Sequence, residues 1–303
     1  MDARRDLPWD VVGIGENSVD EVLLVRAMPS SGGKAEMVAR HVVCGGQTAT
    51  AMYACARLGL RAKYAGATGA DDNGRLIRRE LAGLGVDLAH VVERDAPSRR
   101  AVILVEESTG ERAVIWRRDP RLDLQMAELP LADLTRTRVV HVDQTDPVAA
   151  LGAARAARDA GALVTTDIDH VMPCTRGLTE LATHAIFAEP AAKALAGDDN
   201  LERALRAIAG GTRATLVATC GTRGAVALAQ GCCVSVPAYQ VRAVDTTGAG
   251  DVFRAGFIYA LVKEEPIDRA LRVANAAAAI SCTRVGAMNG APSLEELSGL
   301  LER

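Results

Sequence analysis

The sequence predicts an α/β protein in which helices cover a largely parallel sheet. Two observations favour this class. Strand-like and helix-like stretches alternate along most of the 303 residues, as in repeated β-α-β units. Two further stretches break the alternation and have the pattern of β-hairpins, which indicates a small second sheet. No internal repeat or low-complexity linker divides the chain, so we expect a single domain, 1–303, that carries a lid.

The first part of the chain predicts two strand–helix units. The apolar run 9–15 is the expected first strand. The small-residue stretch 47–59 has helical spacing and stops at Gly59, a natural C-terminal cap. A strand over 61–69 and a helix over 73–84, ended by Gly85, follow.

The second half predicts four more parallel strands. They are expected over 138–143, 162–167, 184–189 and 214–221, with a helix from Pro147 to Ala160 between the first two. Each of these strands ends in, or just before, polar or glycine residues. Ligands bind at the carboxyl ends of strands in open α/β sheets, so we expect the site at this edge.

The two hairpin-like stretches predict the lid. The first pairs 20–28 with 36–43 around a Pro-Ser-Ser-Gly-Gly turn, and the second pairs 101–107 with 111–116 around a turn at 108–110. Together they would form a small antiparallel sheet that stands off the main one, within about 17–44 and 99–118. Apolar strands with exposed edges favour pairing with another copy, so we expect a homodimer through the lid.

Composition limits the partners. A net charge of −3 and only 3% aromatic residues give neither a basic footprint nor stacking platforms for nucleic acid. No segment has the length and apolarity of a membrane-spanning helix, and the N-terminus does not resemble a signal peptide. Seven cysteines without zinc or disulfide spacing fit a reducing cytoplasm. We therefore expect a cytoplasmic protein with a small-molecule partner.

The most informative segment is 244–262, VDTTGAGDVFRAGFIYALV. Gly248, Ala249 and Gly250 are small, and a helical pattern starts after them, so unpaired backbone N–H groups would face outward at the positive end of a helix dipole. Such a turn is an anion hole suited to a moving phosphoryl group. Asp251 at its rim would act as a general base, worth about 10²–10⁴ in rate. The alternative is that Asp251 only caps the helix.

At the string D-T-T-G-A-G-D the chain resembles the ribokinase-like (PfkB) carbohydrate kinase family, whose second signature it matches. Gly45-Gly46, a small-residue helix and RLGLRAKYAGATGADDNG resemble the family's first signature. The turn from Thr219 to Gly224 and the residue Asn275 match two nucleotide-binding positions. This resemblance implies a ribokinase-like three-layer α/β/α sandwich with a mostly parallel sheet and a small β-sheet lid.

The resemblance also assigns roles to individual residues. It implies an ATP- and magnesium-dependent sugar kinase in which Asp251 is the base and residues 248–250 form the anion hole. Sugar contacts would come from Asp20, Gly45, Gly46 and, where many members have Asn, Thr50. ATP contacts would come from Thr219, Gly221, Gly224 and Asn275. Asp245 and Thr247, with backbone near Gly286, match a loop that binds a potassium-like ion in many members; the alternative for Asp245 is a turn-forming side chain.

The chain departs from the family where magnesium is organised. Many members have N-x-x-E after the strand that ends here at Ala188, but both expected positions are alanine. Glu189 is the nearby carboxylate and our candidate magnesium residue, although it could equally supply N-terminal helix charge. The strings FAEP and CTRVGAMNGAP resemble the ketohexokinase and sulfofructose kinase-like branch, which favours a ketohexose or a derivative as substrate.

Other polar residues have two interpretations each. Asp143, Asp167 and Asp169 lie at strand ends, and Asp143 would contact the sugar or a metal, or cap the next loop. The pairs Arg99-Arg100 and Arg117-Arg118 flank the second hairpin and would clamp an anionic substrate, or stay solvated.

Four other functions have partial support in the sequence. The Gly13-x-Gly15 stretch lacks the third glycine and the helix of a nicotinamide-binding motif, and Gly32-Gly33-Lys34 lacks the rest of a P-loop. A nucleoside kinase of the same superfamily would use the same base and anion hole, but sparse aromatics disfavour it. The remaining rival is a sugar or nucleotide sensor without activity.

Overall fold

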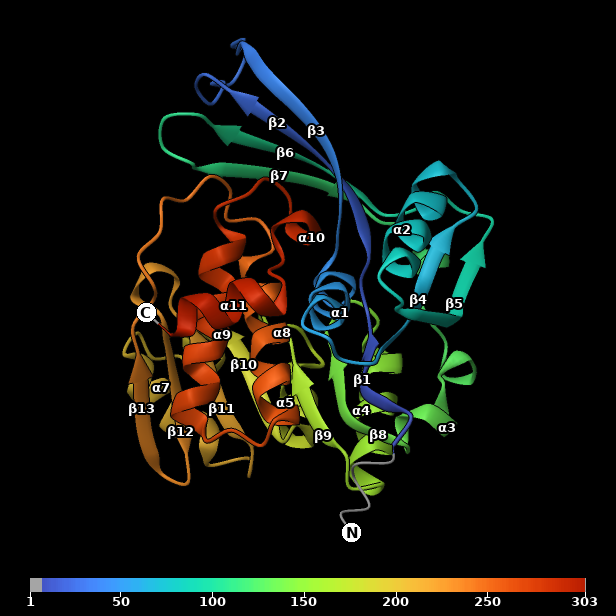
Figure 1. Cartoon of the computed structure of the whole chain (residues 1–303), viewed down its shortest axis with the longest axis vertical. Helices are drawn as coiled ribbons and strands as arrows, with labels where there is room; N and C mark the ends of the chain where they lie inside the picture. Colours follow the sequence, from blue (N-terminus) through green and yellow to red (C-terminus); the bar gives the residue numbers. More distant parts are fainter. Residues whose placement is uncertain (1–6, 303) are drawn as a thin grey trace.

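The computed structural model describes residues 7–302, which form two β-sheets and the helices that cover the larger one (Figure 1). The larger sheet has the strand order β13-β12-β11-β10-β9-β8-β1-β4-β5. The seven strands from β11 to β5 are parallel, while β12 and β13 add to one edge in antiparallel fashion. Their bounds are β1 Trp9–Ile14, β4 Ala62–Gly69, β5 Asp87–Arg94, β8 Thr137–Val142, β9 Leu163–Thr166, β10 His184–Ala188, β11 Thr215–Thr219, β12 Ala225–Ala229 and β13 Cys232–Val236.

Helices pack on both faces of this sheet and give the three-layer α/β/α sandwich that was expected. One apolar core joins strand residues such as Val11 and Val217 to helices α1, α2, α8, α9 and α11. Two further cores cover the opposite face through α3 to α7. The bounds are α1 Gln47–Arg57, α2 Asp72–Gly83, α3 Leu131–Leu134, α4 Pro147–Asp159, α5 Thr175–Leu181, α6 Glu189–Ala196, α7 Leu201–Ala209, α8 Ala249–Val262, α9 Ile267–Ser281, α10 Ala287–Gly290 and α11 Leu294–Leu301.

Small residues make this packing close. The buried positions of α4 are the alanines 149, 150, 153, 154 and 157, a stripe at helical spacing that lies flat on the sheet. Gly59 and Gly85, the expected ends of α1 and α2, both have positive φ, as the C-terminal turn of a helix requires.

The smaller sheet stands above the main one in the order β3-β2-β6-β7 (Figure 1). Its strands are β2 Ser18–Val25, β3 Met37–Gly45, β6 Arg100–Glu106 and β7 Arg112–Arg117. Both hairpins form as expected, but β2 and β6 pair in parallel, so the expectation of a purely antiparallel sheet is wrong. The reason is topological. β2 follows β1 and β6 follows β5 along the chain, and β1 and β5 run in the same direction in the main sheet. Both chain segments therefore leave the same edge of the main sheet and enter the smaller sheet in the same direction.

The chain order therefore places the smaller sheet over the carboxyl ends of the parallel strands, where the site was expected. Between residues 7 and 302, no helix has the length and apolar character needed to cross a membrane. All seven cysteines are free.

Candidate active site

A cavity of about 840 Å³ lies between the lid sheet and the carboxyl ends of the parallel strands. Its floor comes from residues that end five strands or follow them within two positions: Glu16, Gln144, Asp167, Ala188 and Thr219. Consecutive parallel strands bring these residues to one edge although more than 200 positions separate the first from the last. We call this space the acceptor cavity, after the expected sugar contact Asp20 and the expected base Asp251 that line it.

The lid supplies the roof of the acceptor cavity. On β7 the cavity-lining residues are Arg112, Val114 and Trp116, which alternate along the strand as side chains on one face of a sheet must. From β2, Asp20 reaches the same space; it is buried, and it accepts a hydrogen bond from Ser18 Oγ at 2.8 Å. Burial raises the pKa of Asp20. A side chain at Gly45 would collide with the Asp20 carboxylate, so this glycine leaves room for it.

A second cavity of about 380 Å³ adjoins the first and is lined largely by apolar side chains. Thr219, Gly221 and Gly224, at the end of β11, form one wall, and Asn275 of α9 forms another. The Asn275 amide donates hydrogen bonds to the carbonyls of Val236 and Pro237, at 3.0 and 3.1 Å, and so ties α9 to the end of β13 and the residue after it. We call this space the nucleotide cavity, after the expected ATP-binding residues that line it. The four expected ATP-binding residues therefore lie together around it.

The two cavities share three residues, Thr219, Thr246 and Gly250. Gly250 belongs to the glycine turn at the start of α8, where Gly248 has φ +77°, a left-handed conformation that favours glycine. The Ala249 N–H donates to Thr246 O at 3.3 Å. The N–H groups of Gly250 and Asp251 have no acceptor among residues 7–302, so two donors of the helix N-terminus stay available at the junction.

Asp251 is half-buried, lines the acceptor cavity and is the third residue of α8. Within the described chain its carboxylate accepts no hydrogen bond from a backbone N–H, so the geometry does not show it capping the helix. Burial, and then the negative charge of Asp167, raise the pKa of Asp251, whereas the Arg254 guanidinium lowers it. Burial likewise raises the pKa of Asp167 to about 7. Arg254 Nη2 lies 2.6 Å from Asp167 Oδ1 in a buried ion pair.

Three expected sugar contacts lie apart from the cavity walls. Gly45 and Thr50 line neither cavity, whereas Gly46 does line the acceptor cavity. The Thr50 hydroxyl is buried without a hydrogen-bond partner among the described residues. Asp143 is also outside both cavities. Its carboxylate accepts hydrogen bonds from Glu16 N, Thr48 Oγ1 and Thr145 N at 2.7, 2.7 and 2.9 Å, so it holds the loops after β1 and β8 in place.

The expected metal-binding residues fall into two places. Glu189 begins α6 and pairs with Lys193 Nζ at 2.7 Å and with Arg223, and it lines neither of the two cavities. Asp245 accepts hydrogen bonds from Thr247 N at 2.8 Å and Gly286 N at 2.9 Å, the geometry of a turn-forming side chain. The Thr247 hydroxyl is buried with no hydrogen-bond partner in the part of the chain described.

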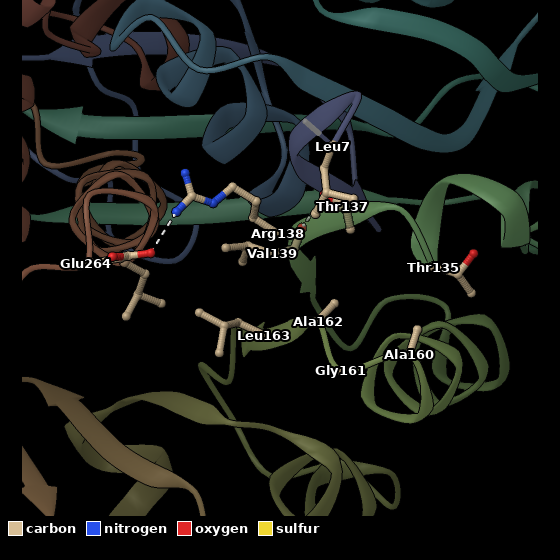
Figure 2. A pocket seen from close by; sticks show the side chains of 11 residues that line it. Leu7, Thr135, Thr137, Arg138, Val139, Ala160, Gly161, Ala162, Leu163 and Glu264 are labelled. Atoms are coloured by element: carbon tan, nitrogen blue, oxygen red, sulfur yellow. Dashed lines mark hydrogen bonds and ion pairs between the residues drawn. The ribbon is translucent and has the colours of Figure 1, made fainter. Parts of the chain in front are cut away.

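A third hollow, of about 210 Å³, lies at the opposite edge of the main sheet, by the amino ends of β8 and β9. Figure 2 shows its walls, with an ion pair between Arg138 and Glu264 at 3.3 Å. None of the expected site residues lies there.

Comparison with known proteins decides the family. The model of the pfkB family carbohydrate kinases matches residues 10–294. The chain belongs to this family. It is therefore an ATP-dependent carbohydrate kinase, an enzyme that transfers a phosphoryl group to a carbohydrate.

Individual relatives cover nearly the whole chain. An ATP-dependent ribose-1-phosphate kinase of Halopiger xanaduensis is 30% identical over 96% of this chain and 97% of its own length. Fructokinase-1 of Oryza sativa is also 30% identical, over 96% and 97%. A candidate ribokinase from Agrobacterium tumefaciens, known from a crystal structure, is 31% identical with a TM-score of 0.90 and covers 97% and 99% of the two chains. These pfkB relatives differ in acceptor, so the family alone does not name the sugar.

Sequence reasoning missed three residues that line the acceptor cavity: Arg112, Arg254 and Thr246, the last of which also lines the nucleotide cavity. A signal existed for Arg254, because it is the one charged residue after Asp251 in the otherwise apolar helix α8. Arg112 had no such signal, since its strand carries charged residues at both ends.

Proposed function

We propose that this enzyme transfers the γ-phosphoryl group of ATP to a hydroxyl of a neutral sugar, a ketohexose or a derivative that lacks an anionic group. Asp251 takes the proton from the attacking hydroxyl, and the backbone amides at the start of α8 stabilise the charge that moves with the phosphoryl group. The observation that carries this proposal is that the acceptor and nucleotide cavities meet at Gly250, with the Asp251 carboxylate on the acceptor side.

Each cavity suits one substrate. The nucleotide cavity is largely apolar, as a purine requires, and its end at Gly250 has the unpaired N–H groups that phosphate oxygens need. The acceptor cavity is lined by many polar groups, among them Asp20, Gln144 and Asp169, which suit the hydroxyls of a sugar. The lid roof keeps water from the transfer point, which prevents hydrolysis of ATP.

The charges of the acceptor cavity favour a neutral acceptor over a sugar phosphate. Six carboxyl groups line it (Glu16, Asp20, Asp123, Asp167, Asp169 and Asp251) against four guanidinium groups (Arg99, Arg112, Arg118 and Arg254). Two lid-side arginines are already paired, Arg99 with Glu16 at 2.6 Å and Arg118 with Asp146 at 2.6 Å. Arg100 and Arg117 do not line the cavity. An anionic acceptor would therefore meet more carboxyl groups than guanidinium groups, and at Arg99 and Arg118 it would have to displace existing ion pairs.

Metal ions would assist at two positions. Magnesium, which proteins usually hold through substrate phosphates and one or two carboxylates, would neutralise charge on the ATP phosphates. Glu189 remains our candidate carboxylate, and it would have to release Arg223 or Lys193 to serve. A potassium-like ion would find oxygen ligands at Asp245 and at the unpartnered Thr247 hydroxyl.

An ADP-release screen tests the proposal. The panel contains fructose and related ketohexoses, ribose, the corresponding sugar phosphates including ribose 1-phosphate, and nucleosides. We expect turnover with a neutral ketohexose at a kcat/KM at least about tenfold above that of its phosphate, since an added charge without a partner costs more than about 1.4 kcal/mol. Turnover confined to nucleosides or to sugar phosphates would contradict the proposed acceptor, and silence across the panel would favour a sensor.

We also propose that the enzyme is cytoplasmic and dimerises through the lid. Free thiols in all seven cysteines fit a reducing compartment. The lid's edge strands β3 and β7 expose apolar side chains that do not line the cavity, including Met37 at 54%, Val42 at 47% and Ile115 at 65%. Sedimentation at micromolar concentration should give a dimer that Ile115→Lys converts to a monomer. A wild-type monomer would refute lid-mediated dimerisation.

A further inference from the structure

Arg254 is a buried cation at the floor of the acceptor cavity. Only 3% of the residue is exposed, and it lies one helical turn after Asp251 on α8. Its Nη2 pairs with Asp167, which is 1% exposed, at 2.6 Å. Burying both charges costs solvation energy that one ion pair alone repays only partly. A structural role would be served better by apolar residues, as in the rest of this helix.

The guanidinium lies against the glycine turn. A Cβ built on Gly250 would approach Arg254 Nη1 to 2.9 Å, tighter than side-chain contacts allow. The absence of a side chain at Gly250 therefore makes room for the guanidinium. Because Gly250 lines both cavities, Nη1 is at the junction where the two substrates would meet.

The hydrogen bonds of Arg254 are incomplete. Its Nε is buried and has no hydrogen-bond partner among residues 7–302, and the same holds for Asp167 Oδ2. Arginine has five N–H donors in a planar fork, and a buried donor left unpaired costs about 1–3 kcal/mol. Asp167 therefore fixes one end of the fork while the other donors remain free for an oxyanion.

We propose that Arg254 binds the γ-phosphoryl group of the nucleotide at the junction of the cavities, and that Asp167 positions its guanidinium for this contact. The inference rests on the proposed function, because it takes Gly250 as the transfer point. It adds a fixed side-chain cation to the backbone donors of the anion hole. Arg254 pairs with Asp167 and lies one helical turn after Asp251, so its charge would offset part of the repulsion between the phosphoryl group and these carboxylates.

An anionic group of the acceptor is the other possible source of an oxyanion. The contact with Gly250 favours the nucleotide, since that residue is shared with the nucleotide cavity whereas most acceptor-cavity residues are not. The excess of carboxyl groups around the acceptor argues the same way.

Calorimetry on Arg254→Gln tests the proposal without knowledge of the acceptor. The probes are ADP and the non-hydrolysable β,γ-imido analogue of ATP, each with magnesium. We expect the affinity for the analogue to fall about tenfold or more while that for ADP changes less than about twofold, because only the analogue carries a γ-phosphoryl group. Arg254→Lys keeps the charge but not the fork, and should recover part of the loss. With an acceptor from the panel, kcat of Arg254→Gln should fall about 10²–10³-fold.

Equal losses for ADP and the analogue would overturn the proposal, and so would a defect confined to the KM of the acceptor. Arg158→Gln is the matched control: Arg158 of α4 donates to the carbonyls of Leu181 and Ala182 far from both cavities, so only stability should change. If Arg254→Gln does not fold, the double variant Arg254→Met, Asp167→Leu removes both charges, and its retained preference for the analogue would equally refute the contact. The wild type could be inactive on the whole panel while Arg254→Gln still loses affinity for the analogue and not for ADP. That result would refute the proposed acceptor and leave the contact between Arg254 and the γ-phosphoryl group supported.

Discussion

Arg112 of lid strand β7 donates a hydrogen bond from Nη1 to the Thr246 hydroxyl at 3.3 Å. Thr246 precedes the glycine turn and lines both cavities, so this contact joins the lid to the loop that would hold the transferring phosphoryl group. The two segments are 134 residues apart in the chain. Closure of the lid and ordering of the loop are therefore expected to occur together.

Arg112→Gln should weaken this coupling. The contact is exposed, so its loss should cost less than about 1 kcal/mol and raise the KM for ATP by no more than about fivefold. Steady-state kinetics of the variant and the wild type measure the effect. Arg117→Gln is the matched control, because Arg117 is exposed on the same strand but faces away from the cavity. An equal effect of the control would contradict a specific role for Arg112.

Gly248→Ala should impair both stability and activity. The residue has φ +77°, and a Cβ would lie 2.7 Å from Ala287 Cα and closer still to Ala287 Cβ. Gly85 has nearly the same φ, +75°, with nothing near a built Cβ, so Gly85→Ala measures the backbone cost alone, about 1 kcal/mol. Urea unfolding should show Gly248→Ala to be about 1–3 kcal/mol worse than this control. Equal destabilisation would mean that the turn can move freely.

His141 should make stability fall at acid pH. The side chain is fully buried, and burial lowers its pKa to about 3, with the Arg254 charge as a second cause. The unfolded chain therefore binds a proton that the folded chain refuses between about pH 6.5 and 3, so stability is lost as pH falls through this window. From pH 6.5 to 5 this histidine should contribute a loss of about 1.6 kcal/mol in the free energy of unfolding. Denaturant titrations of the wild type and His141→Asn at pH 6.5 and 5 measure this loss. The variant should lose about 1.6 kcal/mol less stability than the wild type between the two pH values. Equal losses in the two proteins would contradict the assignment to His141.

Most of the architecture was predictable because buried parallel strands and small-residue helices have clear periodic patterns. The first strand, α1, β4, α2, β8, α4 and β9 to β11 all lie within two residues of their expected bounds. The strands β5, β12 and β13 and the helices α3, α5 to α7 and α9 to α11 were not predicted. β5 and β13 are edge strands, and β5 is only half-buried along its length, so neither has the apolar pattern of a central strand.

The site was predictable only where short motifs carried it. The glycine turn, Asp251 and the expected ATP-binding positions, which all lie around the two cavities, could be proposed because they are contiguous or belong to a signature. The acidic residues at strand ends were not separable by sequence: Asp143 is held by three hydrogen bonds outside the cavity, whereas Asp167 lies inside it. Which of them faces the cavity depends on tertiary packing. The partnership of Asp167 with Arg254 joins β9 to α8 and leaves no trace in either segment alone.

The central claim is that Asp251 accepts the proton of the attacking hydroxyl. Asp251→Asn removes the basic oxygen and keeps the shape of the side chain, so nucleotide affinity by calorimetry should stay within about threefold of wild type while single-turnover phosphoryl transfer slows by at least about 10²-fold. A variant that binds ATP and transfers its phosphoryl group at nearly the wild-type rate would contradict the account.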